Sequence, residues 1–151
     1  MKKKIKKETY SVFISHSSED KLGYVDDLVK EIKALNINVF YDTDVINWGD
    51  NLKEKIDIGL ETCELAIIVI SPSYFGREWT EYEIQTLLKR QDKENSKLIL
   101  PILHKVSKEE FVKHYPLLKD IVFKYSKSQS KKSLAISLKT ELDKKTMRRA
   151  G

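Results

Sequence analysis

The chain has 151 residues, enough for one domain that hides roughly two-thirds of its unfolded surface in a single core. With 40% hydrophobic residues its composition is ordinary for a globular protein, and its longest uncharged apolar run, residues 65–70, is far shorter than the ~20 residues of a membrane span. The single cysteine, Cys63, excludes an internal disulfide and a cysteine-based metal site and fits a reducing, cytoplasmic location.

The formal net charge of +5 comes largely from the two ends of the chain. We interpret residues 1–8 as a basic N-terminal tail and residues 144–151 as a basic C-terminal tail or a linker to an absent module, such as a sensor. Neither run has interleaved aromatic residues, so we expect no DNA-specific binding. The N-terminal run also lacks the apolar segment of a signal peptide.

Between these tails, in residues 9–143, short apolar runs alternate with longer amphipathic ones. In chain order the patterns predict a strand at Tyr10–Ser15, a helix at Val25–Leu35, a strand at Ile37–Tyr41, a polar loop at Asp42–Asp50, a helix at Asn51–Glu61, a strand at Leu65–Ser71, a helix from Trp79, a strand at Lys97–Leu103, a short helix at Ser107–His114, a strand at Asp120–Ser126 and a last helix around Leu134–Leu142.

This alternation predicts an α/β fold, because right-handed crossovers between consecutive strands force them to be parallel. We expect a flavodoxin-like five-stranded parallel sheet with helices on both faces. Such sheets bind ligands at the carboxyl ends of their strands. Residues 15–20, 42–50 and 71–79 should therefore gather at one edge of the sheet.

The helix from Trp79 raises the first functional question, because Glu78, Glu81 and Glu83 crowd its first turns. The helix dipole favours acids near an N-terminus and explains Glu78 and most of Glu81. At 100° per residue Glu83 falls on the same ridge as Trp79 and Leu87, where a carboxylate loses solvation. Geometry alone leaves open whether Glu83 has a special role.

The loop after the first strand, "SHSSED", has an ordinary explanation, in which Ser17 or Ser18 caps a helix favoured by Glu19 and Asp20. His16 by itself does not indicate a metal ligand, and three histidines in the whole chain do not favour a zinc site. There is no glycine-rich phosphate loop of the Walker or GxGxxG type.

The loop at residues 42–50 is longer than a strand–helix connection requires and carries Trp48 beside Gly49. An aromatic residue at a loop tip is typical of a binding surface. Trp48 folding back over its own helix is an equally good interpretation of the sequence.

Together these stretches resemble the Toll/interleukin-receptor (TIR) domain, from about Tyr10 to Leu142. Four segments occur in that family's order and spacing: "YSVFISHSSEDK", "VFYDTDVINWGDNL", "LAIIVISPSYFGREW" and the W-x-x-x-E of Trp79 and Glu83. The "ISHSSED" segment is more similar to microbial members than to animal receptor adaptors.

In NAD-cleaving members of the family the glutamate of W-x-x-x-E is the catalytic carboxylate, which the resemblance places at Glu83. The resemblance implies NAD⁺ as substrate, no further cofactor, no metal, and a substrate site built from Phe13, Ser15, His16, Asp42, Trp48, Gly49 and Trp79. The arginine that some animal enzymes carry after the first strand is missing here. Arg77 and Lys21 are the candidates for neutralising the pyrophosphate.

The implied function is an NAD⁺ glycohydrolase that releases nicotinamide and forms ADP-ribose or a cyclic isomer, is activated by self-association with other TIR domains, and serves bacterial antiphage defence. The alternative is a non-catalytic TIR–TIR scaffold or host-signalling mimic that docks through residues 42–51. A phospho-receiver domain has a similar layout, but it needs an acidic pair after the first strand and an aspartate at the end of the third. Ser15-His16 and Ser71-Pro72 stand there instead.

Overall fold

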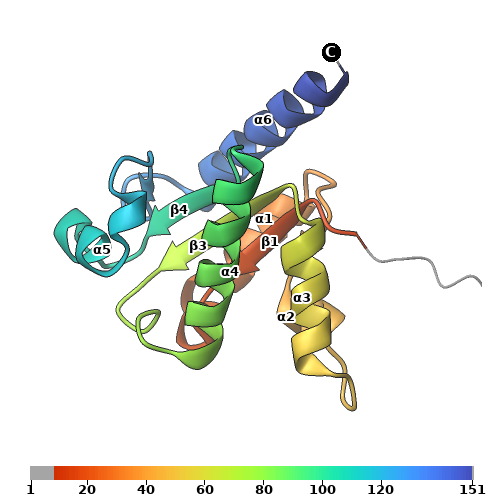
Figure 1. The fold of residues 1–151 in the computed structure, drawn as a ribbon, viewed down its shortest axis with the longest axis horizontal. Helices are drawn as coiled ribbons and strands as arrows, with labels where there is room; N and C mark the ends of the chain where they lie inside the picture. Colours follow the sequence, from red (N-terminus) through yellow and green to blue (C-terminus); the bar gives the residue numbers. More distant parts are fainter. Residues whose placement is uncertain (1–8, 151) are drawn as a thin grey trace, which may run out of the picture.

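Five strands form the sheet at the centre of the molecule, and the computed structural model describes them within residues 9–150. The strands are β1 (Val12–Ser15), β2 (Val39–Phe40), β3 (Leu65–Ile70), β4 (Ile99–Leu103) and β5 (Lys124–Tyr125). All neighbours pair in parallel, in the order β2-β1-β3-β4-β5 (Figure 1). The predicted flavodoxin-like sheet is confirmed. The predicted N-terminal tail, residues 1–8, lies outside the described residues.

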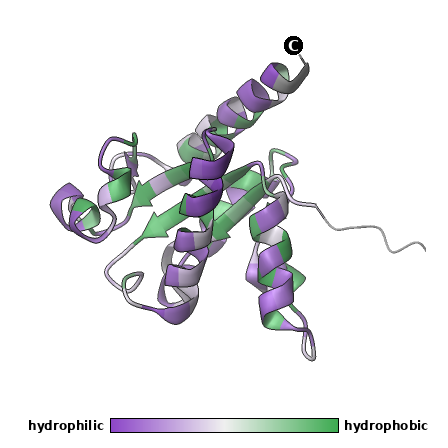
Figure 2. Ribbon diagram, viewed as in Figure 1, coloured by the Kyte–Doolittle hydropathy of each residue, from purple (hydrophilic) through white to green (hydrophobic). Residues whose placement is uncertain are grey.

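Helices cover both faces of this sheet, as predicted. They are α1 (Asp26–Lys33), α2 (Asp42–Val45), α3 (Leu52–Thr62), α4 (Glu78–Glu94), α5 (Lys108–His114) and α6 (Lys131–Ala150), with shorter turns η1 (Ser18–Asp20), η2 (Lys21–Val25) and η3 (Pro116–Leu118). One core cluster lies under α3, α4 and α5, and a second lies under α1 and α6. The strands between the clusters are the most apolar part of the fold, while the helices are polar on their outer sides (Figure 2). Among the described residues no helix is long and apolar enough to cross a membrane.

The fifth strand is shorter than the predicted Asp120–Ser126. Only Lys124 and Tyr125 pair with β4. Ile121, Phe123 and Tyr125 alternate along the chain because each packs against the core cluster under α5. Side-chain packing therefore produces the period of a strand in a segment that is mostly turn and bend.

Two predicted connections also contain more helix than expected. The predicted loop 42–50 begins with the single turn of α2, in which Ile46 N donates to Asp42 O. The last helix continues through residues 144–150, and Lys145 Nζ donates to the carbonyl of Glu64 at 2.6 Å. The domain boundary at residue 143 is thus not marked by the end of a helix and stays a prediction.

Close packing between α3 and the sheet depends on Gly59. A Cβ at this position would lie 2.8 Å from the Phe13 ring and 2.7 Å from the Phe40 ring. These two rings stack on each other with centroids 4.9 Å apart. The absence of a side chain at Gly59 therefore lets α3 lie directly on the β1–β2 pair.

Candidate active site

The carboxyl ends of β1 and β3 bring two of the predicted loops to the N-terminal part of α4. Ser15, the last residue of β1, pairs with Ile68 of β3. After β3, Tyr74 donates its backbone N–H to Ser71 O, and Gly76 adopts φ +71°, which turns the chain into α4. The expectation that these loops meet at one edge is confirmed.

The closest polar contact at this edge joins Ser15 to Glu83. Ser15 Oγ donates to Glu83 Oε1 at 2.6 Å, and Tyr74 Oη lies 2.7 Å from the same Ser15 oxygen. Ser15 and Tyr74 are fully buried, whereas Glu83 is half-buried. Ser15 and Glu83, both predicted site residues, are therefore in direct contact. Tyr74, which was not predicted, contacts the same Ser15 hydroxyl.

The environment of Glu83 makes its charge unusual. Burial raises the pKa of its carboxyl group to about 8, against the opposing effect of the Ser15 hydrogen bond, and the charge of Asp42 raises it further. Among the described residues nothing donates a hydrogen bond to Glu83 Oε2. The site thus holds a poorly solvated carboxylate with one oxygen fixed by Ser15.

Asp42 and His16 form a second part of the same edge. His16 Nε2 lies 3.9 Å from Asp42 Oδ1, and Lys21 Nζ donates to that oxygen at 2.9 Å. Burial would raise the pKa of Asp42, but the Lys21 hydrogen bond and the charges of His16 and Lys21 outweigh it and lower the pKa. Burial lowers the pKa of His16. Near neutral pH Asp42 is therefore charged and His16 is neutral.

The two basic candidates for a pyrophosphate are both engaged in the structure. Lys21 holds Asp42 and also donates to Thr43 Oγ1 at 2.8 Å. Arg77 donates to Glu19 and, at 2.6 Å, to the carbonyl of Ser73. Arg77 and its Glu19 partner are exposed enough for a ligand phosphate to compete for the guanidinium.

Aromatic candidates lie in three different environments. Phe13 is 1% exposed and stacks on Phe40 in the core, so its binding role stays a prediction. Trp79 is partly buried on α4, one turn before Glu83, with its ring edge-on to Tyr82 at 5.7 Å. Trp48 is fully exposed beside Gly49, which has φ +94°. The interpretation that Trp48 folds back over its helix is wrong, and the exposed loop tip is confirmed.

The three acids at the start of α4 separate in the structure. Glu78 is exposed at the first turn. Glu81 Oε1 accepts from Gly76 N at 3.2 Å and from Tyr115 Oη at 2.6 Å, so it fixes the preceding loop against α5. Glu83 alone among them faces the end of β1.

Sequence reasoning missed Tyr74 and Asp20. Asp20 Oδ2 accepts from Ser71 Oγ and, at 3.3 Å, from Ser73 Oγ, which ties the loop after β1 to the loop after β3. The only local signal for Tyr74 is that it stands, with Phe75, between a buried strand and a helix. The carboxylate of Asp20 is already explained by its place at a helix N-terminus. The sequence therefore gives no reason to expect its hydrogen bonds to Ser71 and Ser73.

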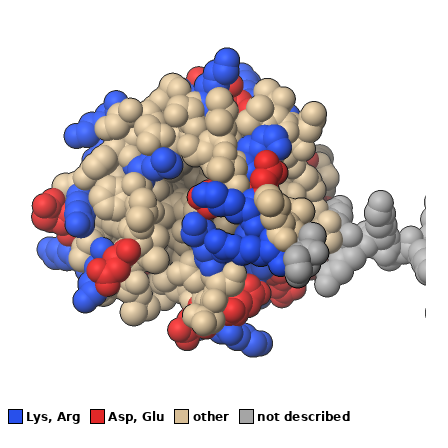
Figure 3. All heavy atoms as spheres, turned by 90° about the horizontal axis from the view of Figure 1, so that it is seen from above, with Lys and Arg blue, Asp and Glu red and all other residues tan. Residues whose placement is uncertain are grey.

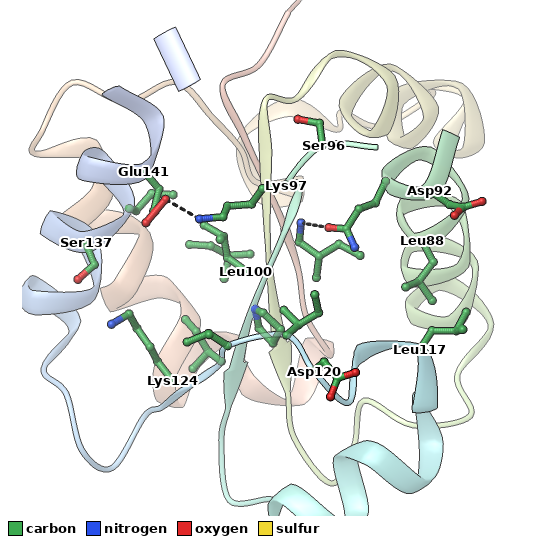
Figure 4. A pocket seen from close by; sticks show the side chains of 18 of the residues that line it. Leu88, Asp92, Ser96, Lys97, Leu100, Leu117, Asp120, Lys124, Ser137 and Glu141 are labelled. Atoms are coloured by element: carbon green, nitrogen blue, oxygen red, sulfur yellow. Dashed lines mark hydrogen bonds and ion pairs between the residues drawn. The ribbon is translucent and has the colours of Figure 1, made fainter. Parts of the chain in front are cut away.

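The surface also has a groove that Glu83 does not line. A groove of about 1150 Å³ runs along β4 between α4 and α6, with Leu88, Leu100 and Leu117 among its lining side chains and Lys97 bonded to Glu141 across it (Figure 4). Figure 3 shows lysines and arginines gathered beside a hollow on the face seen from above, with acids close by. Within residues 9–150 no group of three or more His, Cys, Asp or Glu side chains is placed to hold a metal ion.

Comparison with known proteins decides the family. The TIR domain family matches residues 12–138. The chain belongs to the TIR domain family. This TIR domain is 41% identical over 111 residues to the 2′ cyclic ADP-D-ribose synthase BtTIR of Bacteroides thetaiotaomicron, covering 74% of this chain and 38% of that protein. It is 34% identical over 129 residues to the NAD(+) hydrolase TcpC of Escherichia coli, covering 85% of this chain and 42% of TcpC. The chain thus spans about two-fifths of the length of these relatives.

Solved structures agree on the fold. The TIR domain of the Toll-related receptor TRR-2 from Hydra magnipapillata superposes with a TM-score of 0.62 at 22% identity, covering 78% of this chain and 84% of that chain. A TIR-STING receptor from C. gigas gives a TM-score of 0.64 at 15% identity, covering 90% and 43%. These similarities extend the TIR fold assignment to nearly the whole described chain.

Proposed function

We propose that this TIR domain cleaves the bond between nicotinamide and ribose in NAD⁺, with Glu83 as the catalytic carboxylate. The observation that carries the proposal is the fixed, poorly solvated Glu83 carboxylate at the carboxyl edge of the sheet. The names of the relatives, NAD(+) hydrolase and 2′ cyclic ADP-D-ribose synthase, support the same substrate. No further cofactor or metal is part of this proposal, and NAD⁺ as substrate suits a cytoplasmic location.

The chemistry requires little besides a well-placed negative charge. When the C–N glycosidic bond breaks, its electron pair goes to the pyridinium nitrogen, so nicotinamide leaves neutral and needs no general acid. Glu83 faces the positive charge that develops on the ribose, and its free Oε2 is available to the ribose hydroxyls. One preorganised contact of this kind is worth roughly 3–4 kcal/mol of barrier, and orientation by the surrounding loops supplies the rest.

The remaining candidates frame the substrate in this proposal. Ser15 fixes Glu83, Asp42 and His16 line the neighbouring loop, and Trp79 offers an aromatic surface on the same helix. We assign the pyrophosphate to Arg77, whose exposed Glu19 partner a ligand phosphate can displace. Phe13 contributes through the packing beneath Ser15 rather than by an open surface.

The acceptor that replaces nicotinamide decides the product. Water adds at the ribose carbon, loses one proton and gives ADP-ribose, whereas an internal nucleophile of the substrate gives a cyclic isomer. The relatives carry names of both kinds. Product identification therefore belongs to the first experiment.

Self-association is the second part of the proposal. Trp48 and Gly49 lie on an exposed loop, where they are accessible to a neighbouring copy and can complete its substrate site. The relatives exceed this chain in length, which suits an adjacent sensor module. A role in antiphage defence completes the proposal. The same exposed loop also suits a non-catalytic scaffold or host-signalling mimic that binds other TIR domains.

The test is nicotinamide release by concentrated protein with NAD⁺, with and without a matrix that enforces self-association. Wild type releases nicotinamide, with ADP-ribose or its cyclic isomer as the second product. Glu83→Gln keeps an acceptor for Ser15 but has no charge, and it loses this activity. Equal NAD⁺ loss in both proteins refutes the role of Glu83, and absence of turnover in wild type under every condition favours the scaffold.

A further inference from the structure

Tyr74 is the innermost member of a hydrogen-bond chain that ends on Glu83. Its hydroxyl lies 2.7 Å from Ser15 Oγ, which in turn lies 2.6 Å from Glu83 Oε1. Tyr74 and Ser15 are 0% exposed, so water does not compete for either hydroxyl. The three residues come from three different segments: the end of β1, the loop after β3 and the second turn of α4.

The number of hydroxyl protons decides which group donates in each of these hydrogen bonds. A serine hydroxyl has one proton, and Ser15 gives it to the Glu83 carboxylate. Ser15 Oγ is then the acceptor in its contact with Tyr74. We propose that Tyr74 is a positioning residue for NAD⁺ cleavage: its hydroxyl donates to Ser15 and thereby commits the single Ser15 proton to the Glu83 carboxylate. This inference rests on the proposed function of Glu83.

The opposite direction is geometrically poorer. If Glu83 carried a proton on Oε1, it would donate to Ser15, Ser15 would donate to Tyr74, and the Tyr74 proton would need another acceptor. The carbonyl of Thr80 is 3.4 Å from Tyr74 Oη, a long contact for an O–H donor. With the proton on Oε2, a neutral Glu83 still accepts from Ser15 through Oε1, but a hydroxyl donates more strongly to a carboxylate than to a neutral carboxyl group. The two short bonds of the first arrangement therefore stabilise the charged form that the chemistry needs.

Tyr74 retains its proton over the working pH range. Burial raises its pKa well above the usual value, and the charge of Glu83 raises it further. Thr80 Oγ1 donates to the Tyr74 carbonyl at 2.6 Å and fixes the backbone that carries the ring. A permanent donor in a fixed position is what a positioning role requires.

Within residues 9–150, the other polar groups around Glu83 do not supply a competing donor. Asp42, at the start of α2, acts on Glu83 through its charge, and that charge raises the pKa of Glu83. His16 faces Asp42. On the far side of Tyr74, Tyr115 of the α5 segment donates its proton to Glu81 at 2.6 Å. Tyr115 is therefore also a buried tyrosine that donates to a carboxylate of α4, but it takes no part in the hydrogen bonds that reach Glu83. This makes Tyr115 a matched control.

The experiment compares Tyr74→Phe with Tyr115→Phe. In each protein the titration of Glu83 is followed by carbon NMR of its labelled carboxyl group, and the pH dependence of kcat/KM for NAD⁺ is measured alongside. Removal of the Tyr74 hydroxyl raises the Glu83 pKa and moves the acid limb of the kcat/KM profile upward by about 0.5–1 pH unit. Tyr115→Phe moves neither quantity.

A double-mutant cycle tests whether Tyr74 acts through Ser15. In a Ser15→Ala background, Tyr74→Phe produces no further shift in the Glu83 titration, because the link between the two groups is already absent. Replacing Tyr74 by 3-fluorotyrosine keeps the ring and strengthens the donor, so it lowers the Glu83 pKa. This second variant decides the matter if Tyr74→Phe does not fold.

Two results overturn the proposal: an unchanged Glu83 titration in the Tyr74 variants, or the same shift with and without Ser15. Because the NMR titration needs no substrate, it tests the hydrogen-bond chain even if wild type shows no NAD⁺ turnover. Failure of turnover refutes the enzymatic function, whereas failure of the titration refutes the role of Tyr74.

Discussion

Ser15 Oγ and Glu83 Oε1 lie 2.6 Å apart although 68 positions separate the two residues. The parallel sheet brings them together, because β1 and β3 are neighbours and the chain turns after β3 into α4. A residue that ends one strand thus meets a residue on the helix that follows the next strand in the sheet.

The proposed cleavage depends on pH through Glu83. If the ionised form is required, kcat/KM for NAD⁺ increases with pH through the Glu83 pKa of about 8 and then levels off. At pH 6 the expected value is ~1% of the plateau, because only that fraction of Glu83 is ionised two units below its pKa. Glu83→Gln measured at every pH supplies the background of spontaneous NAD⁺ decay. A flat profile between pH 6 and 9 contradicts the assignment.

The same pKa makes Glu83 a source of pH-dependent instability. Folding raises the pKa from 4.5 to about 8, so the folded state binds an extra proton between these values and wild type loses stability as pH rises through this window. Glu83→Gln removes this dependence. Its advantage in free energy of unfolding should grow from near zero at pH 4.5 to roughly 3–5 kcal/mol above pH 8.

Urea unfolding of both proteins across pH 4.5–9 measures this difference. Other titrating groups, including Asp42 and His16, are present in both proteins and cancel to first order. A difference that stays constant with pH, or that shrinks as pH rises, shows that Glu83 titrates normally.

Sequence patterns predicted the sheet because the apolar runs of its central strands stand out from their surroundings. Leu65–Ile70, buried along its whole length, reads directly as a central strand. The segment 120–126 could not be assigned in the same way. Its alternating side chains pack against the core, although most of its backbone does not pair with β4. A sequence shows the spacing of side chains but not which backbone groups form hydrogen bonds.

The candidate site was predictable only where local sequence patterns or the family resemblance pointed to a residue. The helical ridge shared by Trp79 and Glu83 follows from local geometry, and the family resemblance singled out Ser15. Tyr74 depends on a contact across 59 positions, and Asp20 on one across 51, so no local pattern contains either. The sequence allows two positions for Trp48, because the conformation of a loop depends on the surroundings of the whole loop.

Gly59 provides a test of how α3 is seated beneath the site. A Cβ in Gly59→Ala would lie 2.8 Å from Phe13 and 2.7 Å from Phe40, closer than packed atoms allow. Since both rings are stacked in the core, the strain should lower the free energy of unfolding by about 1–3 kcal/mol. Gly23→Ala is the matched control, because nothing lies within 4 Å of its added Cβ, and its effect should stay within ~0.5 kcal/mol. Equal stability of the two variants contradicts the close packing of α3.

Trp48 separates folding from self-association, because its fully exposed side chain contributes little to the stability of one domain. Trp48→Ser should leave the free energy of unfolding within about 0.5 kcal/mol of wild type, while NAD⁺ cleavage falls under conditions that enforce self-association. Specific activity as a function of protein concentration, with sedimentation velocity on the same samples, distinguishes loss of assembly from loss of site completion. Met147→Gln removes another exposed apolar side chain, on α6, and should preserve both readouts. If Trp48→Ser keeps wild-type activity at every concentration, the 42–50 loop does not complete a neighbour's site, and Glu83 must act within a single domain.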